Sequence, residues 1–234
     1  MRPAAGLRMR RPERQLMADW VTISSLATAG GTLVLAVATF SSVRSANRSA
    51  RLAERTLLAG VRPILTPSRE DDPAERIRFG DEQMVYVPGH GGAVEVGPEA
   101  IYLALGVRNG GSGLAVIHGW HVSPRGPTPA QGGRSESQPD LDAFHRQNID
   151  LYIPAGDSGY WLGALRDPNE PEYKEIQDAA NADQAIQIDL LYGDHEGGQR
   201  QIARYVTSLW PEADIEGRRA IVVRYWSIDG QDPR

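Results

Sequence analysis

The segment IYLALGVRNGGSG, residues 101–113, decides the kind of fold that this chain adopts. Large aliphatic side chains at Ile101, Leu103, Leu105 and Val107 alternate with Tyr, Ala, Gly and Arg. Because successive side chains of a strand point to opposite faces of a sheet, this alternation predicts a strand with one aliphatic face toward a core. The NGGSG run that follows is rich in turn residues and predicts a reversal into a paired strand.

Similar short runs rich in Val, Ile, Leu, Tyr and Trp continue on both sides, separated by Gly, Asn, Asp and Pro. The strands expected from them lie near 62–67, 84–87, 93–96, 101–109, 115–122, 149–153, 158–165, 185–192, 199–209 and 220–227. No long helix alternates with these runs, which favours a mainly β, antiparallel sandwich over residues 62–234 rather than a parallel α/β fold. A Pro-rich stretch at about 123–148 is expected to be a mobile loop, and residues 171 to about 180 a short helix.

The N-terminal part has a different pattern. A gap of 24 residues without a formal charge lies between Asp19 and Arg44, although 24% of the chain is charged. A helix rises about 1.5 Å per residue, so about 20 apolar residues cross a bilayer core of about 30 Å. The sequence therefore predicts a basic tail at 1–19 and one transmembrane helix at 20–43.

Two alternatives to a spanning helix are a cleaved signal peptide with small residues at 36–38 and a buried helix of a soluble protein. The length of the apolar region argues against the first, and the arginines on both sides argue against the second. Five arginines lie in residues 1–18 and five in 44–62, so the charge balance leaves the orientation nearly even. Asp19 at the N-terminal edge favours a cytoplasmic location for the soluble domain.

Residues 44–61 are expected to continue the membrane helix as a stalk that ends near Gly60 and Pro63. Its apolar positions repeat every three or four residues, but over too short a length for a stable coiled coil. Four arginines form one stripe along this helix, and they are Arg44, Arg48, Arg51 and Arg55. The stripe is equally consistent with contacts to anionic lipid headgroups of the bilayer and with a solvated face that signals topology.

Small residues in the membrane segment, Ala27, Gly30 and Gly31, form a flat surface on which two helices could pack closely. We expect from them a weak homo-oligomer through the membrane helix and stalk. The alternative is that glycine and alanine only fill a moderately apolar span.

Charge and cysteine content exclude several classes of function. Residues 1–62 carry a net charge of +7 and the remainder −12. An acidic domain lacks the basic face that nucleic acid requires, so no nucleic-acid partner is expected. The chain has no cysteine, which excludes disulfides, thiolate zinc sites and cysteine nucleophiles.

Several short motifs carry a resemblance to a known group of proteins. They are VRPIL at 61–65, GVRNGGSG at 106–113, YIPAGD at 152–157 and LYGD at 191–194, all after a membrane helix and an arginine-rich stalk. This order resembles uncharacterised bacterial single-pass membrane proteins with an immunoglobulin-like β-sandwich as their soluble domain. The resemblance implies an antiparallel immunoglobulin-like sandwich and brings no established activity.

One motif suggests catalysis. Residues 156–159, GDSG, are similar to the nucleophile loop of chymotrypsin-like serine proteases, which would make Ser158 a nucleophile. The match ends at Tyr160 and Trp161, and no suitable histidine motif precedes it. A glycine turn that opens the next strand explains the same four residues.

Neither histidine-containing cluster predicts a metal site. His118 and His121 are three positions apart, so on a regular strand they face opposite sides unless a bulge at Gly119 intervenes. The run 194–196, Asp-His-Glu, reads as the solvated tip of a hairpin. The sequence therefore predicts no catalytic set, no cofactor and no metal.

The resulting functional expectation is a membrane-anchored, non-enzymatic binding or scaffolding module for an unidentified protein partner. The alternative is a membrane-tethered hydrolase that uses Ser158. Alternation also predicts that one of Tyr160 and Trp161 faces outward, where exposed aromatics would mark a partner surface.

Overall fold

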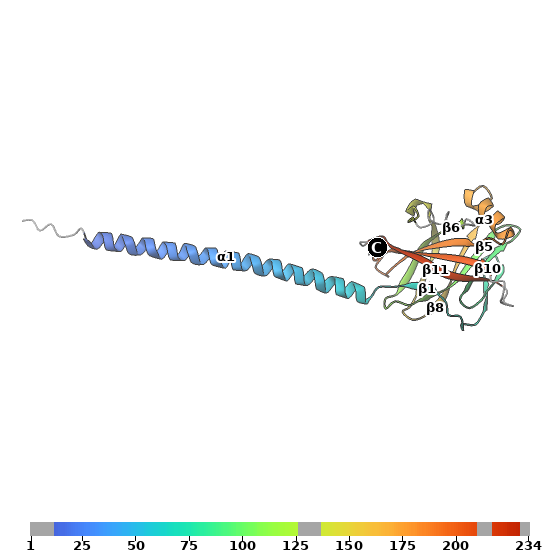
Figure 1. Cartoon of the computed structure of the whole chain (residues 1–234), viewed down its shortest axis with the longest axis horizontal. Helices are drawn as coiled ribbons and strands as arrows, with labels where there is room; N and C mark the ends of the chain where they lie inside the picture. Colours follow the sequence, from blue (N-terminus) through green and yellow to red (C-terminus); the bar gives the residue numbers. More distant parts are fainter. Residues whose placement is uncertain (1–11, 126–136, 210–216, 230–234) are drawn as a thin grey trace, which may run out of the picture. The chain divides into compact units, whose positions relative to one another are not determined.

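A computed structural model describes residues 12–125, 137–209 and 217–229 of the chain. The chain forms two compact units, Met1–Leu57 and Leu58–Arg234. Figure 1 shows that the first unit is helical and the second is built mainly of strands.

Helix α1 runs without interruption from Pro12 to Gly60. Its part from Thr22 to Glu54 is long and apolar enough to cross a membrane. Side-chain hydroxyls in this part bond back to carbonyls of the preceding turn, as Thr28 Oγ1 does to Ser24 O at 2.8 Å and Thr32 Oγ1 does to Thr28 O at 2.8 Å. These bonds reduce the cost of placing hydroxyl-rich helix in lipid.

Strands dominate the second unit, and most of the predicted ones are present. Their bounds are β1 (Leu65–Pro67), β2 (Glu75–Arg78), β3 (Met84–Val87), β4 (Gly91–Val96), β5 (Ile101–Asn109), β6 (Ala115–Pro124), β7 (His145–Ile153), β8 (Ser158–Leu165), β9 (Ile186–Gly193), β10 (Gln201–Leu209) and β11 (Arg218–Ser227). A short 3₁₀ helix, η1 (Leu141–Ala143), precedes β7, and helix α3 (Pro171–Asn181) follows β8. Strand β2 was not predicted, and η1 and the start of β7 lie within the stretch 123–148 that was expected to be a loop.

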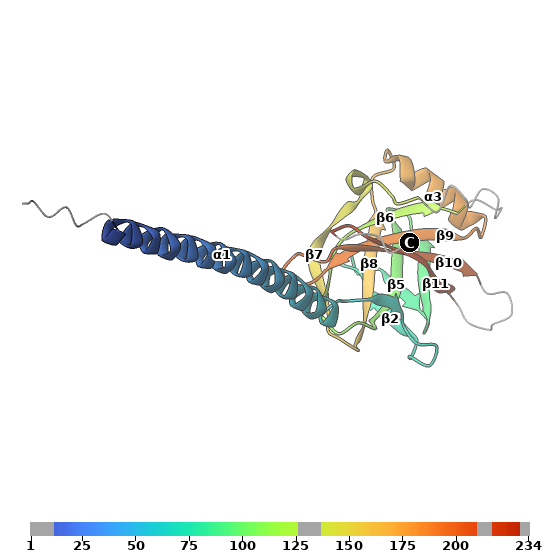
Figure 2. The same ribbon diagram turned by 60° about the vertical axis from the view of Figure 1, so that its left-hand side comes forward.

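Nine strands form one antiparallel sheet in the order β1-β5-β4-β11-β10-β9-β6-β7, with β8 paired to β5. Strands β4 and β1 share one edge of β5, and β8 takes the other. The sheet curves into a half-barrel around its core, as Figure 2 shows. The antiparallel β class is thus confirmed, but the immunoglobulin-like sandwich is not, because the strands around the core belong to one continuous sheet rather than two facing ones.

The core is aliphatic and aromatic. The inward face of β5 supplies the four aliphatic side chains predicted from the alternation, all with no exposed surface. Helix α3 packs on the same core through Tyr173, Ile176 and Ala179. A second cluster lies on the outer face of β5, where the β2–β3 hairpin places Phe79, Val85 and Val87 against Tyr102 and Ala104.

The reversal at 109–113 joins β5 to β6, but these two strands do not pair with each other, so the predicted pairing is wrong. Strand β5 pairs with β1, β4 and β8, whereas β6 pairs with β7 and β9. The physical reason is that the loop is bonded elsewhere: Gly110 N donates to Ile64 O at 2.8 Å and Ser112 N to Arg62 O at 3.2 Å. By contrast, the turn at 193–198 joins β9 and β10, which do pair.

Candidate functional site at the seam of the half-barrel

The half-barrel ends at two strands that follow one another in sequence, β7 and β8. In the described part of the chain, β7 pairs only with β6 and β8 pairs only with β5. Across the seam between them, Gln147 Nε2 donates to Leu162 O at 3.5 Å. One backbone edge of each strand is therefore left without a paired strand, which is the arrangement that accepts an added strand.

A groove of about 790 Å³ lies along this seam. Apolar side chains of Trp120, Leu151, Tyr160 and Leu162 line it, together with charged residues that include Arg78, Arg146, Asp150, Arg166, Asp167 and Glu170. Ile149 also lines the groove and is 80% exposed. An apolar surface with charges of both signs around it resembles the anatomy of a binding site for a polypeptide.

A bulge in β7 shapes the middle of the groove. Gly119 of β6 pairs with Arg146 and Ile117 pairs with Leu151, so four residues of β7, 147–150, oppose His118 alone. A Cβ on Gly119 would lie 2.8 Å from His145 O, so only glycine allows the strands to approach here. The bulge that Gly119 was expected to permit lies in β6 itself, where the pairing with β9 skips His118 between Ile117 and Gly119. The separate bulge in β7 leaves Ile149 exposed to solvent.

A group of metal-type ligands adjoins the groove, to whose lining His145 and Glu170 belong. A ring nitrogen of His145 and carboxylate oxygens of Glu170 and Glu172 all lie within 4.8 Å of one another. The His145 ring stacks on Trp120, with 4.4 Å between ring centroids and 23° between the planes. Sequence reasoning missed this group because His145 lies on β7 and the two glutamates lie at the start of α3.

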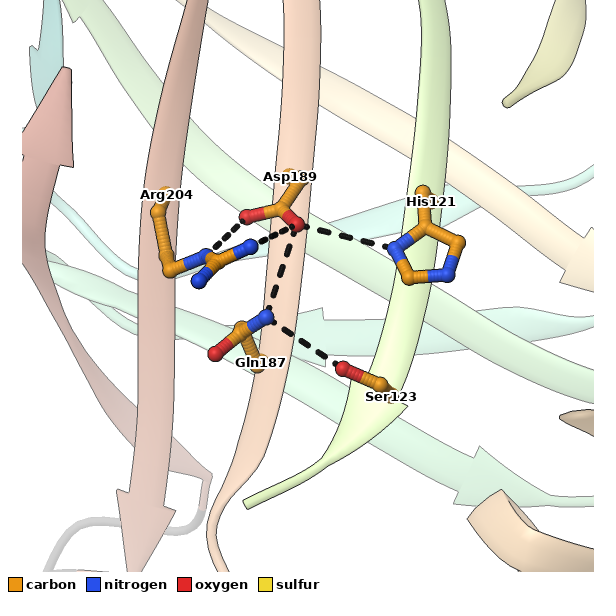
Figure 3. A network of polar contacts seen from close by, with 5 residues as sticks. All are labelled: His121, Ser123, Gln187, Asp189 and Arg204. Carbon is orange, nitrogen blue, oxygen red and sulfur yellow. Dashed lines mark hydrogen bonds and ion pairs between the residues drawn. The ribbon is translucent and has the colours of Figure 1, made fainter. Parts of the chain in front are cut away.

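A second polar group occupies the outer face of the sheet (Figure 3). Asp189 of β9 accepts hydrogen bonds from Arg204 of β10 and from Gln187, and Gln187 also donates to Ser123 of β6. His121 Nδ1 lies 3.5 Å from Asp189 Oδ2. Because Asp189 has no exposed surface, we assign this network a structural role.

The aromatic ring of Trp226 covers this network. The guanidinium carbon of Arg204 lies 4.6 Å from the ring centroid, and that of Arg224 lies 5.5 Å from it. These are cation–π distances, and they explain how a charged pair on the outer face is removed from solvent. The signal in the sequence was one charged residue in each of two otherwise apolar strands. Strand 186–193 contains the acidic Asp189, and strand 201–209 contains the basic Arg204.

The structure places Ser158 at the first position of β8, after a turn in which Gly156 has φ +84°. Its hydroxyl donates to Asp72 Oδ2 at 3.2 Å, and in the described ranges it bonds to no histidine. A serine nucleophile needs a base that accepts its proton, usually a histidine held by an acid. The described geometry does not supply that histidine.

The other histidines are also separated. His118 lies beside Gly193, whereas His121 contacts Asp189, so the structure does not bring the two together. In the 193–198 turn, Asp194 Oδ1 accepts hydrogen bonds from the backbone of Glu196 and Gly198. The turn is thus built around an Asp side chain.

The aromatic residues are divided as the alternation predicts. Trp161 is fully buried in the core, and Tyr160 lies on the opposite face against the second cluster. Tyr152 is 55% exposed at the end of β7. Trp210 lies outside the described residues.

In the helical unit, the side chains of Arg44, Arg48 and Arg51 are exposed, and that of Arg55 lies outside the described side chains. A Cβ added to Gly30 or Gly31 would meet no atom within 4 Å. Lipid contacts and helix pairing remain predictions.

Comparison with known proteins finds no family model, no curated protein and no solved structure that matches this chain.

Proposed function

We propose that this protein is a single-pass membrane-anchored binding module that holds a partner protein by taking an extended segment of it into the groove between β7 and β8. The observation that carries the proposal is the open seam, where two strands each leave one backbone edge unpaired next to an apolar groove. An extended peptide can add to such an edge through main-chain hydrogen bonds, while pockets for its side chains supply specificity.

Exposure at the groove supports the same conclusion. Proteins often protect a sheet edge with charge, bulges or covering structure, because a free edge recruits other chains. Strand β7 has such features in Arg146, Asp150 and its bulge, but it also presents exposed apolar side chains. Here Ile149, which lines the groove, keeps 80% of its surface exposed, and Tyr152, which lies on β7 outside the groove lining, keeps 55%. Such side chains are suited to be covered by a partner, since burial of apolar surface drives association.

The module is proposed to act by binding rather than by catalysis. The bond from Ser158 to Asp72 leaves the serine without a histidine base in the described part of the chain. The hydrolase alternative predicts that a fluorophosphonate probe labels Ser158 and that Ser158→Ala abolishes the label. Absence of labelling in the folded wild-type protein is the result that we expect.

We further propose that the helix anchors the domain on the cytoplasmic side of a membrane, with the bilayer as its second partner. The exposed arginines after the predicted span favour anionic headgroups, and paired helices would give a weak homo-oligomer. A reporter fused to the C-terminus should be active inside the cell. Activity outside would overturn the orientation and leave the groove unaffected.

Affinity capture with groove variants tests the proposal. The detergent-solubilised full chain should recover a partner reproducibly, and Ile149→Asp, which places a charge at the seam, should reduce recovery at least tenfold. Ile221→Asp is the matched control, because Ile221 is 47% exposed on β11, a strand that β10, β9 and β6 separate from β7. Equal loss with both variants, or no reproducible partner, would contradict the proposal.

A further inference from the structure

We infer that His145, Glu170 and Glu172 form a binding site for one divalent transition-metal ion of the zinc class. Their three ligand atoms lie within 4.8 Å of one another. Tetrahedral ligands bonded to one zinc ion at about 2.0–2.2 Å lie about 3.3–3.6 Å apart, so rotations of the glutamate side chains that shorten the present separations by about 1 Å would complete the site.

The histidine is already held in place. Its ring stacks on Trp120, and its Nε2 atom is buried without a hydrogen-bond partner among the described residues. A buried ring nitrogen without a partner costs free energy, and coordination is one way in which an imidazole nitrogen is satisfied. The stacking on Trp120 therefore fixes the ring while one of its nitrogens lies within 4.8 Å of the two carboxylates.

The two carboxylates are also available. Glu170 is the N-cap residue of α3, and its side chain makes no capping hydrogen bond. Glu172 lies in the first turn. Neither glutamate forms an ion pair with a basic side chain of the described residues. Two neighbouring carboxylates repel each other, and a divalent cation between them would remove that repulsion.

The ligand set indicates the class of metal. An imidazole nitrogen suits zinc and its neighbours in the periodic table, whereas magnesium and calcium prefer oxygen ligands alone. Three protein ligands leave at least one coordination position for another donor. Because His145 and Glu170 also line the groove, that position adjoins the place where a partner segment is proposed to bind.

Calorimetric titration of the full chain in detergent, purified without a polyhistidine tag, tests the site with zinc chloride alone. We expect one zinc ion per chain and at least tenfold weaker binding of magnesium. Glu170→Gln and Glu172→Gln should each weaken zinc binding at least tenfold. His145→Phe keeps an aromatic ring on Trp120 and should lose the site.

The matched control is the double variant His195→Gln/Glu196→Gln, which removes another neighbouring His and Glu, 3.9 Å apart and exposed. It should bind zinc as the wild type does. Cobalt should quench tryptophan fluorescence in the wild type and in this control, but not in Glu172→Gln, with unchanged circular dichroism in all three. Absence of zinc binding to the folded wild type, or equal binding to Glu172→Gln, would overturn the inference. Neither result depends on a partner, so the proposed function is tested separately.

Discussion

The carboxylate of Asp189 and the guanidinium of Arg204 face each other across β9 and β10, with Arg204 Nε 2.7 Å from Asp189 Oδ1 and Nη2 2.9 Å from Oδ2. The two residues are direct register partners, and both side chains are almost completely buried. Two parallel hydrogen bonds of this kind fix the relative position of the strands as well as neutralising both charges.

Loss of one partner should destabilise the domain strongly. Arg204→Met leaves the Asp189 carboxylate buried without its cation, and we expect a loss of about 3–5 kcal/mol in the free energy of unfolding. Urea unfolding followed by tryptophan fluorescence measures it. Arg200→Met is the control, because the Arg200–Asp229 pair is much more exposed and should cost about 1 kcal/mol or less. Equal losses in the two variants would contradict a central role for the buried pair.

Asn109 should be a second point of high sensitivity. Its buried amide donates to Gly113 O at 2.6 Å and to Ile153 O at 2.9 Å, and its Oδ1 accepts from Ile64 N and Gly111 N. Asn109→Ala leaves these backbone groups unsatisfied, so we expect a loss on the order of 3 kcal/mol in urea unfolding.

The exposed Asn181 at the end of α3 provides the control for this experiment. Asn181→Ala should change the free energy of unfolding by no more than about 0.5 kcal/mol. If Asn109→Ala were equally mild, the loop at 109–113 would not be held by this side chain.

The β2–β3 hairpin should loosen in acid. Hydrogen bonds from Tyr102 and Arg166 lower the pKa of Asp81 from 3.8 to about 2. Because the folded-state pKa is below the unfolded value, Asp81 stabilises the fold above about pH 4, and this stabilisation is lost as the pH falls toward 2.

Thermal unfolding of Asp81→Asn checks this pH dependence. The variant should unfold at a lower temperature than the wild type at pH 7, and the difference should narrow between pH 4 and pH 2. Asp71→Asn serves as the control, since it removes an exposed carboxylate that takes no part in the hydrogen bonds of Asp81 with Tyr102 and Arg166. A difference between Asp81→Asn and the wild type that does not change between pH 4 and pH 2 would contradict the assignment.

The stalk arginines should bind anionic lipid. A peptide of residues 42–62 should float with vesicles that contain phosphatidylserine, and high salt should release it, since each arginine near the surface contributes about 1 kcal/mol. Replacement of Arg44, Arg48 and Arg51 by Gln should weaken flotation strongly. Equal flotation with neutral vesicles would favour the alternative, in which the arginines form a solvated helix face and only direct the orientation of the protein in the membrane.

Local patterns were sufficient for much of the fold. Strand β5 has the bounds that alternation predicts, and helix α1 continues as one helix through the expected membrane segment and stalk. Strand β2 was missed because its sequence, ERIR, has three exposed side chains and little β-type pattern. Pairing failed at β5 and β6 because a turn sequence specifies a reversal of the chain, not the strand that lies beside it.

The candidate site could not be predicted for a related reason. The groove exists only because the curved sheet brings β7 near β8 without joining them, and curvature is a property of the whole sheet. The metal-type ligands are 25 residues apart at His145 and Glu170, and the packing of α3 over the core places them together. By comparison, the bulge at Gly119 was foreseeable, since a glycine within a strand is a local signal.

Photo-crosslinking from both sides of the seam tests the central claim most directly. A photoreactive phenylalanine derivative at Ile149 of β7 or at Tyr160 of β8 should trap the same peptide of the same partner protein, identified by mass spectrometry. The derivative at Ile221 of β11 should trap none of it. Capture of different proteins from the two sides, or equal capture from Ile221, would contradict an extended segment bound in the groove between β7 and β8.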